Sequence, residues 1–232
     1  MRRLLLFDID GTLLSTNGAA RRAFHRALLE VYGTTGPIAT HVFDGKTDPQ
    51  IARELMRLAG FGDQVIDSGL NALWNAYLRE LAHELAQPGH ETRLFPGVRA
   101  LLAALKERDA EVCVGLLTGN IARGAALKLS SGRIDHHFAF GAYGSDCERR
   151  DGLPAVAVAR ARDHTGRAFT GREVVIIGDT PHDVTCGQAL GVFTLAVATG
   201  RHSTEDLLRA GADVALPDLS KTDFVLETLL AA

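Results

Sequence analysis

Cysteine is scarce in this chain of 232 residues. Cys113, Cys147 and Cys186 are widely spaced and form no Cys-x-x-Cys pair. An odd, dispersed set of cysteines indicates neither a disulfide framework nor a zinc site. The sequence therefore predicts a protein of a reducing, cytoplasmic compartment.

Long hydrophobic runs and blocks of like charge are also missing. The apolar run near the N-terminus ends at Asp8, and no stretch of 18 apolar residues follows. We therefore expect neither a secretory signal nor a membrane span. The net charge is only −3 and the basic residues are scattered, so neither nucleic acid nor an anionic membrane is an expected partner. No internal repeat or low-complexity segment occurs, and the oligomeric state cannot be predicted.

The composition is that of a globular chain, since 46% of the residues are hydrophobic. A chain of this length can bury a full core as one large domain or as a domain with an insert. The segment 4–14 indicates how that core begins. Leu4 to Phe7 predict a buried parallel strand, and Asp8 and Asp10 follow where the strand ends. Gly11 allows the chain to leave the sheet in a tight turn.

The rest of the chain shows two kinds of sequence pattern. Helical patterns cover 18–33, a segment opening at 47–49, and 64–85, with no clear strand between them. From Leu94 onward, strands alternate with helices. We expect strands at 112–117, 138–140, 174–177, 193–197 and 213–216, and helices at 98–108, 121–130, 153–163, 184–190, 204–210 and 222–230.

This alternation predicts an α/β fold: a three-layer, Rossmann-like parallel sheet core with an inserted α-helical cap domain. The expected domains are a catalytic core at 1–14 and 94–232 and a helical cap at 15–93.

Polar side chains follow several of the predicted strands. Asp8 and Asp10 follow the first, Thr118 ends the second, and Asp179 and Asp183 follow a later one. The carboxyl ends of parallel strands share one edge, so these side chains should meet there. Converging acids repel, and oxygen ligands without a suitably spaced histidine or cysteine favour Mg²⁺ over zinc. A simpler interpretation is that segment 178–183 merely begins a helix, but this leaves the other acids unexplained.

In combination, the segments DIDGT (8–12), LTGN (117–120) and GDTPHD (178–183) resemble the successive motifs of the haloacid dehalogenase-like hydrolase superfamily. The resemblance covers essentially the whole chain, and the helical insert lies where phosphoglycolate-phosphatase-like members carry their cap. It implies that Asp8 is the nucleophile, Asp10 the general acid/base and Thr118 a phosphate-holding hydroxyl. It further implies that Gly119 and Asn120 bind the substrate through the amides that follow Thr118. The expected metal set is Asp8, Asp10, Asp179 and Asp183.

The superfamily also has a basic residue ahead of a helix. Arg149 and Arg150 both fit that description, and we favour Arg150 from its spacing to Leu153. In the cap, Lys46 stands in a polar turn before a helix and is the candidate for binding a second anionic group of the substrate. Asn17, Arg21 and His25 are further candidates for lining the cleft.

These residues predict a magnesium-dependent phosphatase that hydrolyses a small phosphate monoester through an aspartyl-phosphate on Asp8. Asp10 favours phosphoester chemistry, because relatives that cleave carbon–halogen bonds lack an acid at that place. A phosphomutase resembling β-phosphoglucomutase would keep every motif and remains an alternative. A signalling receiver domain is a disfavoured alternative, because such a domain is about half this length and carries its phosphoacceptor on a middle strand. A non-catalytic phosphoacceptor or binding protein is a further alternative.

Overall fold

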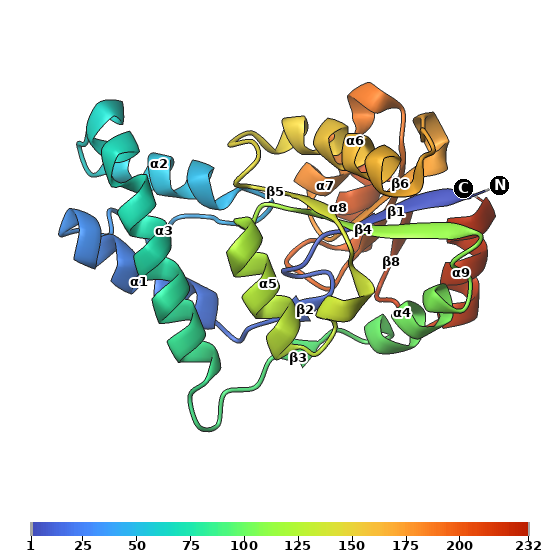
Figure 1. Ribbon diagram of the computed structural model, residues 1–232, viewed down its shortest axis with the longest axis horizontal. Coiled ribbons are helices and arrows are strands. Elements are labelled where there is room, and N and C mark those ends of the chain that lie inside the picture. The colour runs from blue at the N-terminus through green and yellow to red at the C-terminus, as the bar shows by residue number, and fades with distance from the viewer. Residues whose placement is uncertain (1, 232) are drawn as a thin grey trace.

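The computed structural model describes residues 2–231, and within them six parallel strands form one sheet (Figure 1). The strand order is β5-β4-β1-β6-β7-β8. The strands are β1 (Arg3–Phe7), β4 (Val112–Thr118), β5 (Gly141–Tyr143), β6 (Val174–Gly178), β7 (Phe193–Val197) and β8 (Val214–Leu216). This architecture confirms the predicted Rossmann-like fold class.

Helices cover both faces of the sheet because successive residues of a strand point to opposite sides. From β1, Leu5 and Phe7 pack with the core that holds α4 (Val98–Lys106), α5 (Ala122–Ser131) and α9 (Thr222–Ala231). Leu4 and Leu6 pack on the other face, with α6 (Leu153–Thr165). Helices α7 (Pro181–Cys186) and α8 (Thr204–Arg209) complete this layer near β7. β1 is buried on both sides, which explains its uninterrupted apolar sequence.

A separate group of helices lies beside the sheet, on the left in Figure 1. It consists of α1 (Ala19–Tyr32), α2 (Asp48–Leu58) and α3 (Asp63–Leu85). These helices share their own apolar core, in which Phe24 contacts Phe43, Trp74 and Tyr77. α2 begins as its sequence predicts, with Thr47 as N-cap and Pro49 in the first turn. The cap boundaries at residues 15 and 93 stay a prediction.

Two short strands that were not expected from the sequence, β2 (Leu14–Ser15) and β3 (Arg93–Leu94), pair antiparallel where the helical insert leaves and rejoins the core. Two residues are too few for a strand period to be visible in the sequence.

The strand expected at 138–140 was placed too early, because β5 begins at Gly141. Phe138 and Phe140 lie just before it and pack as aromatic side chains, Phe138 edge-on against Phe7.

Helix α7 begins at Pro181 and ends at Cys186, whereas a helix was expected over 184–190; residues 188–190 form a separate short 3₁₀ turn, η4 (Gln188–Leu190). Three further 3₁₀ turns are η1 (Asp135–His137), η2 (Arg150–Gly152) and η3 (Gly171–Glu173). All three cysteines are free thiols, and the cytoplasmic setting stays a prediction. Within residues 2–231, no helix combines the length and apolarity that crossing a bilayer demands.

Candidate active site

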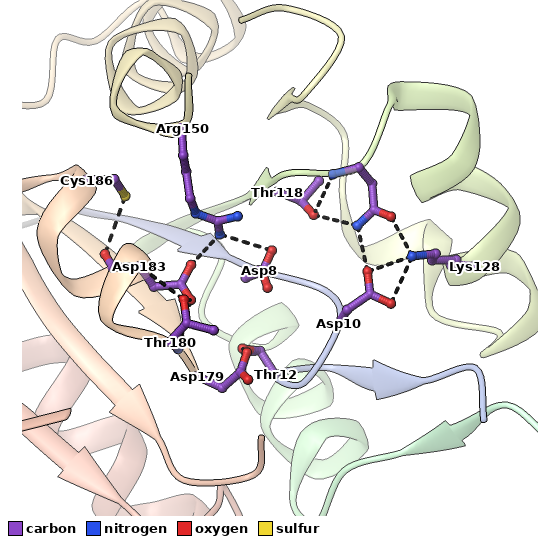
Figure 2. Close-up of polar contacts among 11 residues, drawn as sticks. Asp8, Asp10, Thr12, Thr118, Lys128, Arg150, Asp179, Thr180, Asp183 and Cys186 are labelled. Carbon is purple, nitrogen blue, oxygen red and sulfur yellow. Dashed lines mark hydrogen bonds and ion pairs between the residues drawn. The ribbon is translucent and has the colours of Figure 1, made fainter. Parts of the chain in front are cut away.

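Asp8 stands at the centre of the sheet edge where the strands end. β1 lies between β4 and β6, so the residue after β1 is flanked by Thr118 from one neighbour and Asp179 from the other. The Asp8 side chain is buried, and its Oδ1 lies 3.2 Å from an Arg150 nitrogen (Figure 2). Burial raises the pKa of Asp8 to about 7, although Arg150 opposes this, and repulsion from Asp183 and Asp10 adds to it.

Asp179 and Asp183 reach the same place from the end of β6 and the first turn of α7. Thr12 Oγ1 donates a hydrogen bond of 3.0 Å to Asp179. Burial, and then repulsion from Asp183 and Asp8, raises the pKa of Asp179 well above its usual range.

Asp183 also completes a capping box with Thr180, whose hydroxyl donates to Asp183 Oδ2 at 2.7 Å. The helix-start interpretation of this segment is therefore correct, and Asp183 belongs to the acidic cluster as well.

Glycines allow the backbone to come close to Asp179. A Cβ atom on Gly11 would lie 2.2 Å from Asp179 Oδ2, and a Cβ on Gly200 would lie 2.0 Å from the same atom. Gly11 also has φ of +86°, which side-chain-bearing residues rarely adopt. The turns after β1 and β7 thus lie so close to this carboxylate that a side chain at Gly11 or Gly200 would displace it.

The three acids form a donor set that suits a hard divalent cation. Asp8, Asp179 and Asp183 are all buried, and each offers a carboxylate oxygen within 4.8 Å of the others. Arg150 contacts two of these three carboxylates, those of Asp8 and Asp183, so a further cation would relieve the repulsion that remains. Oxygen ligands alone match Mg²⁺. Within residues 2–231 the group does not include Asp10, whose assignment as a metal ligand stays a prediction.

The structure distinguishes the two candidate arginines by position. Arg150 lies in η2, is 6% exposed and contacts both Asp8 and Asp183. Arg149 points outward, with its side chain 81% exposed and paired to Asp151. Arg150 is thus the one placed beside the candidate nucleophile.

Asp10 belongs to a second polar cluster on the other side of Asp8. Its carboxylate oxygens accept hydrogen bonds of 2.9 and 2.7 Å from Lys128 Nζ, and Asn120 Nδ2 donates to it at 2.7 Å. The same Asn120 nitrogen donates to Thr118 Oγ1 at 2.8 Å. Within residues 2–231, the Thr118 hydroxyl accepts two hydrogen bonds and donates none, so its proton is available to a substrate oxygen.

Lys128 is not among the site residues predicted from the sequence. The sequence nevertheless indicated that Lys128 is buried, because Ala125, Lys128 and Leu129 share one buried face of α5 at helical spacing. A lysine on such a face is seldom buried without a partner.

A cavity of about 510 Å³ lies between these clusters and the helical insert. The predicted residues that line it are Asp8, Asp10, Thr118, Gly119, Asn120, Arg150, Asp179, Lys46 and Arg21. Asn17 and His25 are not among its lining residues. Lys46 Nζ lies 2.5 Å from Glu54 Oε2, so its charge is already paired within the cap.

Asp48 is a second residue that sequence reasoning missed, and it joins the cap to the core. The Asp48 backbone N–H donates to Gly119 O at 2.7 Å, and its carboxylate accepts from the Ile121 N–H at 2.8 Å. A Cβ atom on Gly119 would lie 2.1 Å from Lys46 O, so glycine is needed there for the cap segment to approach. Asp48 also lines the cavity.

Relatives by sequence include enzymes of phosphate chemistry. A phosphoglycolate phosphatase of Pseudomonas putida is 25% identical over 222 residues, which cover 94% of this chain and 77% of that protein. The tyrosine-protein kinase PtkA of Mycobacterium tuberculosis is 29% identical over 201 residues, covering 85% of this chain and 62% of the relative.

Solved structures share the fold. A hydrolase from Pseudomonas syringae superimposes with a TM-score of 0.72 at 18% identity, covering 97% of this chain and 98% of the other. CbbY from Rhodobacter sphaeroides, solved in complex with phosphate, gives a TM-score of 0.67 at 19% identity, with 95% and 96% covered. The profile of the family described as haloacid dehalogenase-like hydrolase matches residues 5–197. The chain therefore belongs to the haloacid dehalogenase-like hydrolase family and is a hydrolytic enzyme, which confirms the resemblance seen in its motifs.

Proposed function

We propose that this hydrolase is a magnesium-dependent phosphatase that acts on a small phosphate monoester, with Asp8 as the nucleophile. The observation that carries the proposal is the position of Asp8. It is buried at the centre of the sheet edge, contacts Arg150, and shares a cluster with Asp179 and Asp183. A carboxylate so placed is poorly compensated until a cation is bound, as its raised pKa indicates.

Asp8, Asp179 and Asp183 would hold Mg²⁺, which neutralises charge on a phosphoryl group and favours the ionised form of Asp8. Asp8 Oδ attacks phosphorus, forming an O–P bond while the bond to the leaving oxygen breaks. The Arg150 guanidinium and the Thr118 hydroxyl stabilise the charge on the transferring group. Asp10 gives a proton to the leaving oxygen and later takes one from the water that hydrolyses the aspartyl-phosphate.

The cap supports a small substrate. Residues of α1 and of the segment 43–48 line the cavity on the side of the cap. The hydrogen bond from the Asp48 N–H to Gly119 O holds this segment against the core. Its volume of about 510 Å³ suits a metabolite rather than a phosphorylated protein surface. The relatives named as phosphoglycolate phosphatases support a small phosphate ester and make 2-phosphoglycolate a natural member of any substrate panel.

The experiment is a screen of phosphorylated metabolites with the purified chain and Mg²⁺, scoring free phosphate. Asp8→Asn serves as the blank, and exposed Arg149→Met as a control that should keep activity. Release of phosphate that requires both Asp8 and Mg²⁺ is the expected result. Isomerisation of a sugar phosphate without net phosphate release would instead identify a phosphomutase. Activity that persists in Asp8→Asn would refute the assignment of the nucleophile.

A further inference from the structure

Lys128 is a buried cation in contact with the candidate general acid/base. Its side chain is only 4% exposed, and Nζ contacts both oxygens of Asp10 as well as Asn120 Oδ1, the last at 2.5 Å (Figure 2). An ammonium has three N–H donors, and these three acceptors match that number. Lys128 lines the cavity, but none of its three donors remains for a substrate phosphate. Two of the three donate to Asp10, so Asp10 is the reacting group that Lys128 contacts directly.

Asn120 makes this arrangement directional. Its Oδ1 faces the Lys128 ammonium and its Nδ2 faces Asp10 and Thr118. The reverse amide orientation would point the NH₂ group at an ammonium, so the network allows one orientation only. Asp10 is thus anchored by two donors on one side, while 43% of its side chain remains exposed toward the cavity.

We infer that Lys128 is a positioning residue for Asp10, an inference that rests on the proposed phosphatase function. The Lys128 ammonium holds the Asp10 carboxyl group in one place and stabilises the negative charge that appears on it when its proton passes to the leaving oxygen. That charge is present after the transfer and absent before it, so the contact favours the transition state over the ground state. Lys128 keeps its own protons throughout, and Asp10 recovers a proton from the attacking water in the second step.

The role predicts a dependence on the leaving group. An alkoxide leaves poorly without a proton, whereas p-nitrophenolate leaves without one. The value of kcat/KM reports steps up to the release of the leaving group, so later hydrolysis of the aspartyl-phosphate does not enter it. Loss of Lys128 should therefore reduce kcat/KM for an alkyl phosphate far more than for p-nitrophenyl phosphate.

The test compares Lys128→Met with wild type on both esters. We expect kcat/KM to fall by about 100-fold on the alkyl ester, within the range of general acid catalysis, and to fall far less on the aryl ester. Lys128→Arg, which keeps the charge, should recover part of the alkyl activity. Arg123→Met is the matched control, since Arg123 is an exposed cation on the same helix. If Lys128→Met does not fold by circular dichroism, Lys128→Gln replaces it.

A double-mutant cycle gives the second readout. Because Lys128 acts through Asp10, adding Lys128→Met to Asp10→Asn should reduce kcat/KM for the alkyl ester by less than about threefold. Equal losses on the two esters, or losses that multiply in the double variant, would overturn the inference while leaving the proposed function intact. Absence of Asp8-dependent phosphate release from both esters in the wild type would overturn the proposed function and this inference with it.

Discussion

Replacing Asp48 by asparagine should stabilise the protein at neutral and alkaline pH. Burial raises the pKa of Asp48 from its ordinary 3.8 to about 6, although Lys128 and the Ile121 N–H both lower it, and Asp10 adds repulsion. Asparagine keeps an acceptor oxygen for the Ile121 N–H at the same position and carries no charge. The substitution therefore isolates the electrostatic penalty of the ionised group.

The pH dependence of this stabilisation follows from proton linkage. The folded protein holds the Asp48 proton more tightly than the unfolded chain does, so the free energy of unfolding falls as pH rises from about 4 to about 6. Above that window the penalty is complete. A pKa of about 6 in place of 3.8 corresponds to about 3 kcal/mol, which we reduce to about 1–2 kcal/mol because the side chain is partly open to the cavity. For a chain of this size that gain raises Tm by roughly 2–8 °C.

The assay is thermal unfolding followed by circular dichroism in the presence of EDTA. Wild type and Asp48→Asn are each measured at pH 4.5 and at pH 8. Most of the Asp48 titration, which runs from about pH 4 to about pH 6, lies between these two values. The gain in Tm should be large at the higher pH and small at the lower. Asp63→Asn is the matched control, because Asp63 begins α3 at an exposed position where a hydrogen bond from Arg57 lowers its pKa. That control should give no gain at pH 8. A gain for Asp48→Asn that is equal at both pH values, or a loss at pH 8, would show that the ionised Asp48 carboxylate does not destabilise the fold.

Three further predictions concern the candidate active site. Gly119→Ala should lower kcat/KM by about tenfold or more with the fold retained, because its Cβ would collide with Lys46 O and displace the cap segment; unchanged kinetics would show that this contact is dispensable. Arg150→Met should destabilise the protein by about 3–5 kcal/mol in urea unfolding, since it leaves buried carboxylates unpaired, whereas Arg149→Met should have little effect; similar losses would contradict the difference in burial. Millimolar Mg²⁺ should raise the Tm of wild type and not that of Asp179→Asn, and an equal rise in both would place the ion elsewhere.

The layout of the core follows from local sequence patterns. The apolar run before Asp8 and the alternation of strands and helices after Leu94 were enough to predict the parallel sheet, because buried strands and amphipathic helices each carry their own period. The side chains that follow β1, β4 and β6 then converge for a topological reason, since those strands are neighbours and run in one direction. The strand β5 was misplaced because aromatic residues that pack just before a strand resemble the strand itself.

Contacts between segments that are distant in the sequence depend on how the folded elements pack. Lys128 and Asp10 are 118 positions apart, and nothing in either segment indicates that a turn of α5 faces the loop after β1. The same holds for Asp48, whose contact with Ile121 depends on how the cap segment meets the β4–α5 turn. The motifs and their order along the chain were enough to predict that Asp8, Thr118 and Asp179 reach the sheet edge. The orientation of Asp10 and its contact with Lys128 depend on how α5 packs against the core. The helical period of α5 indicates that Lys128 is buried, but it does not indicate which residue Lys128 contacts.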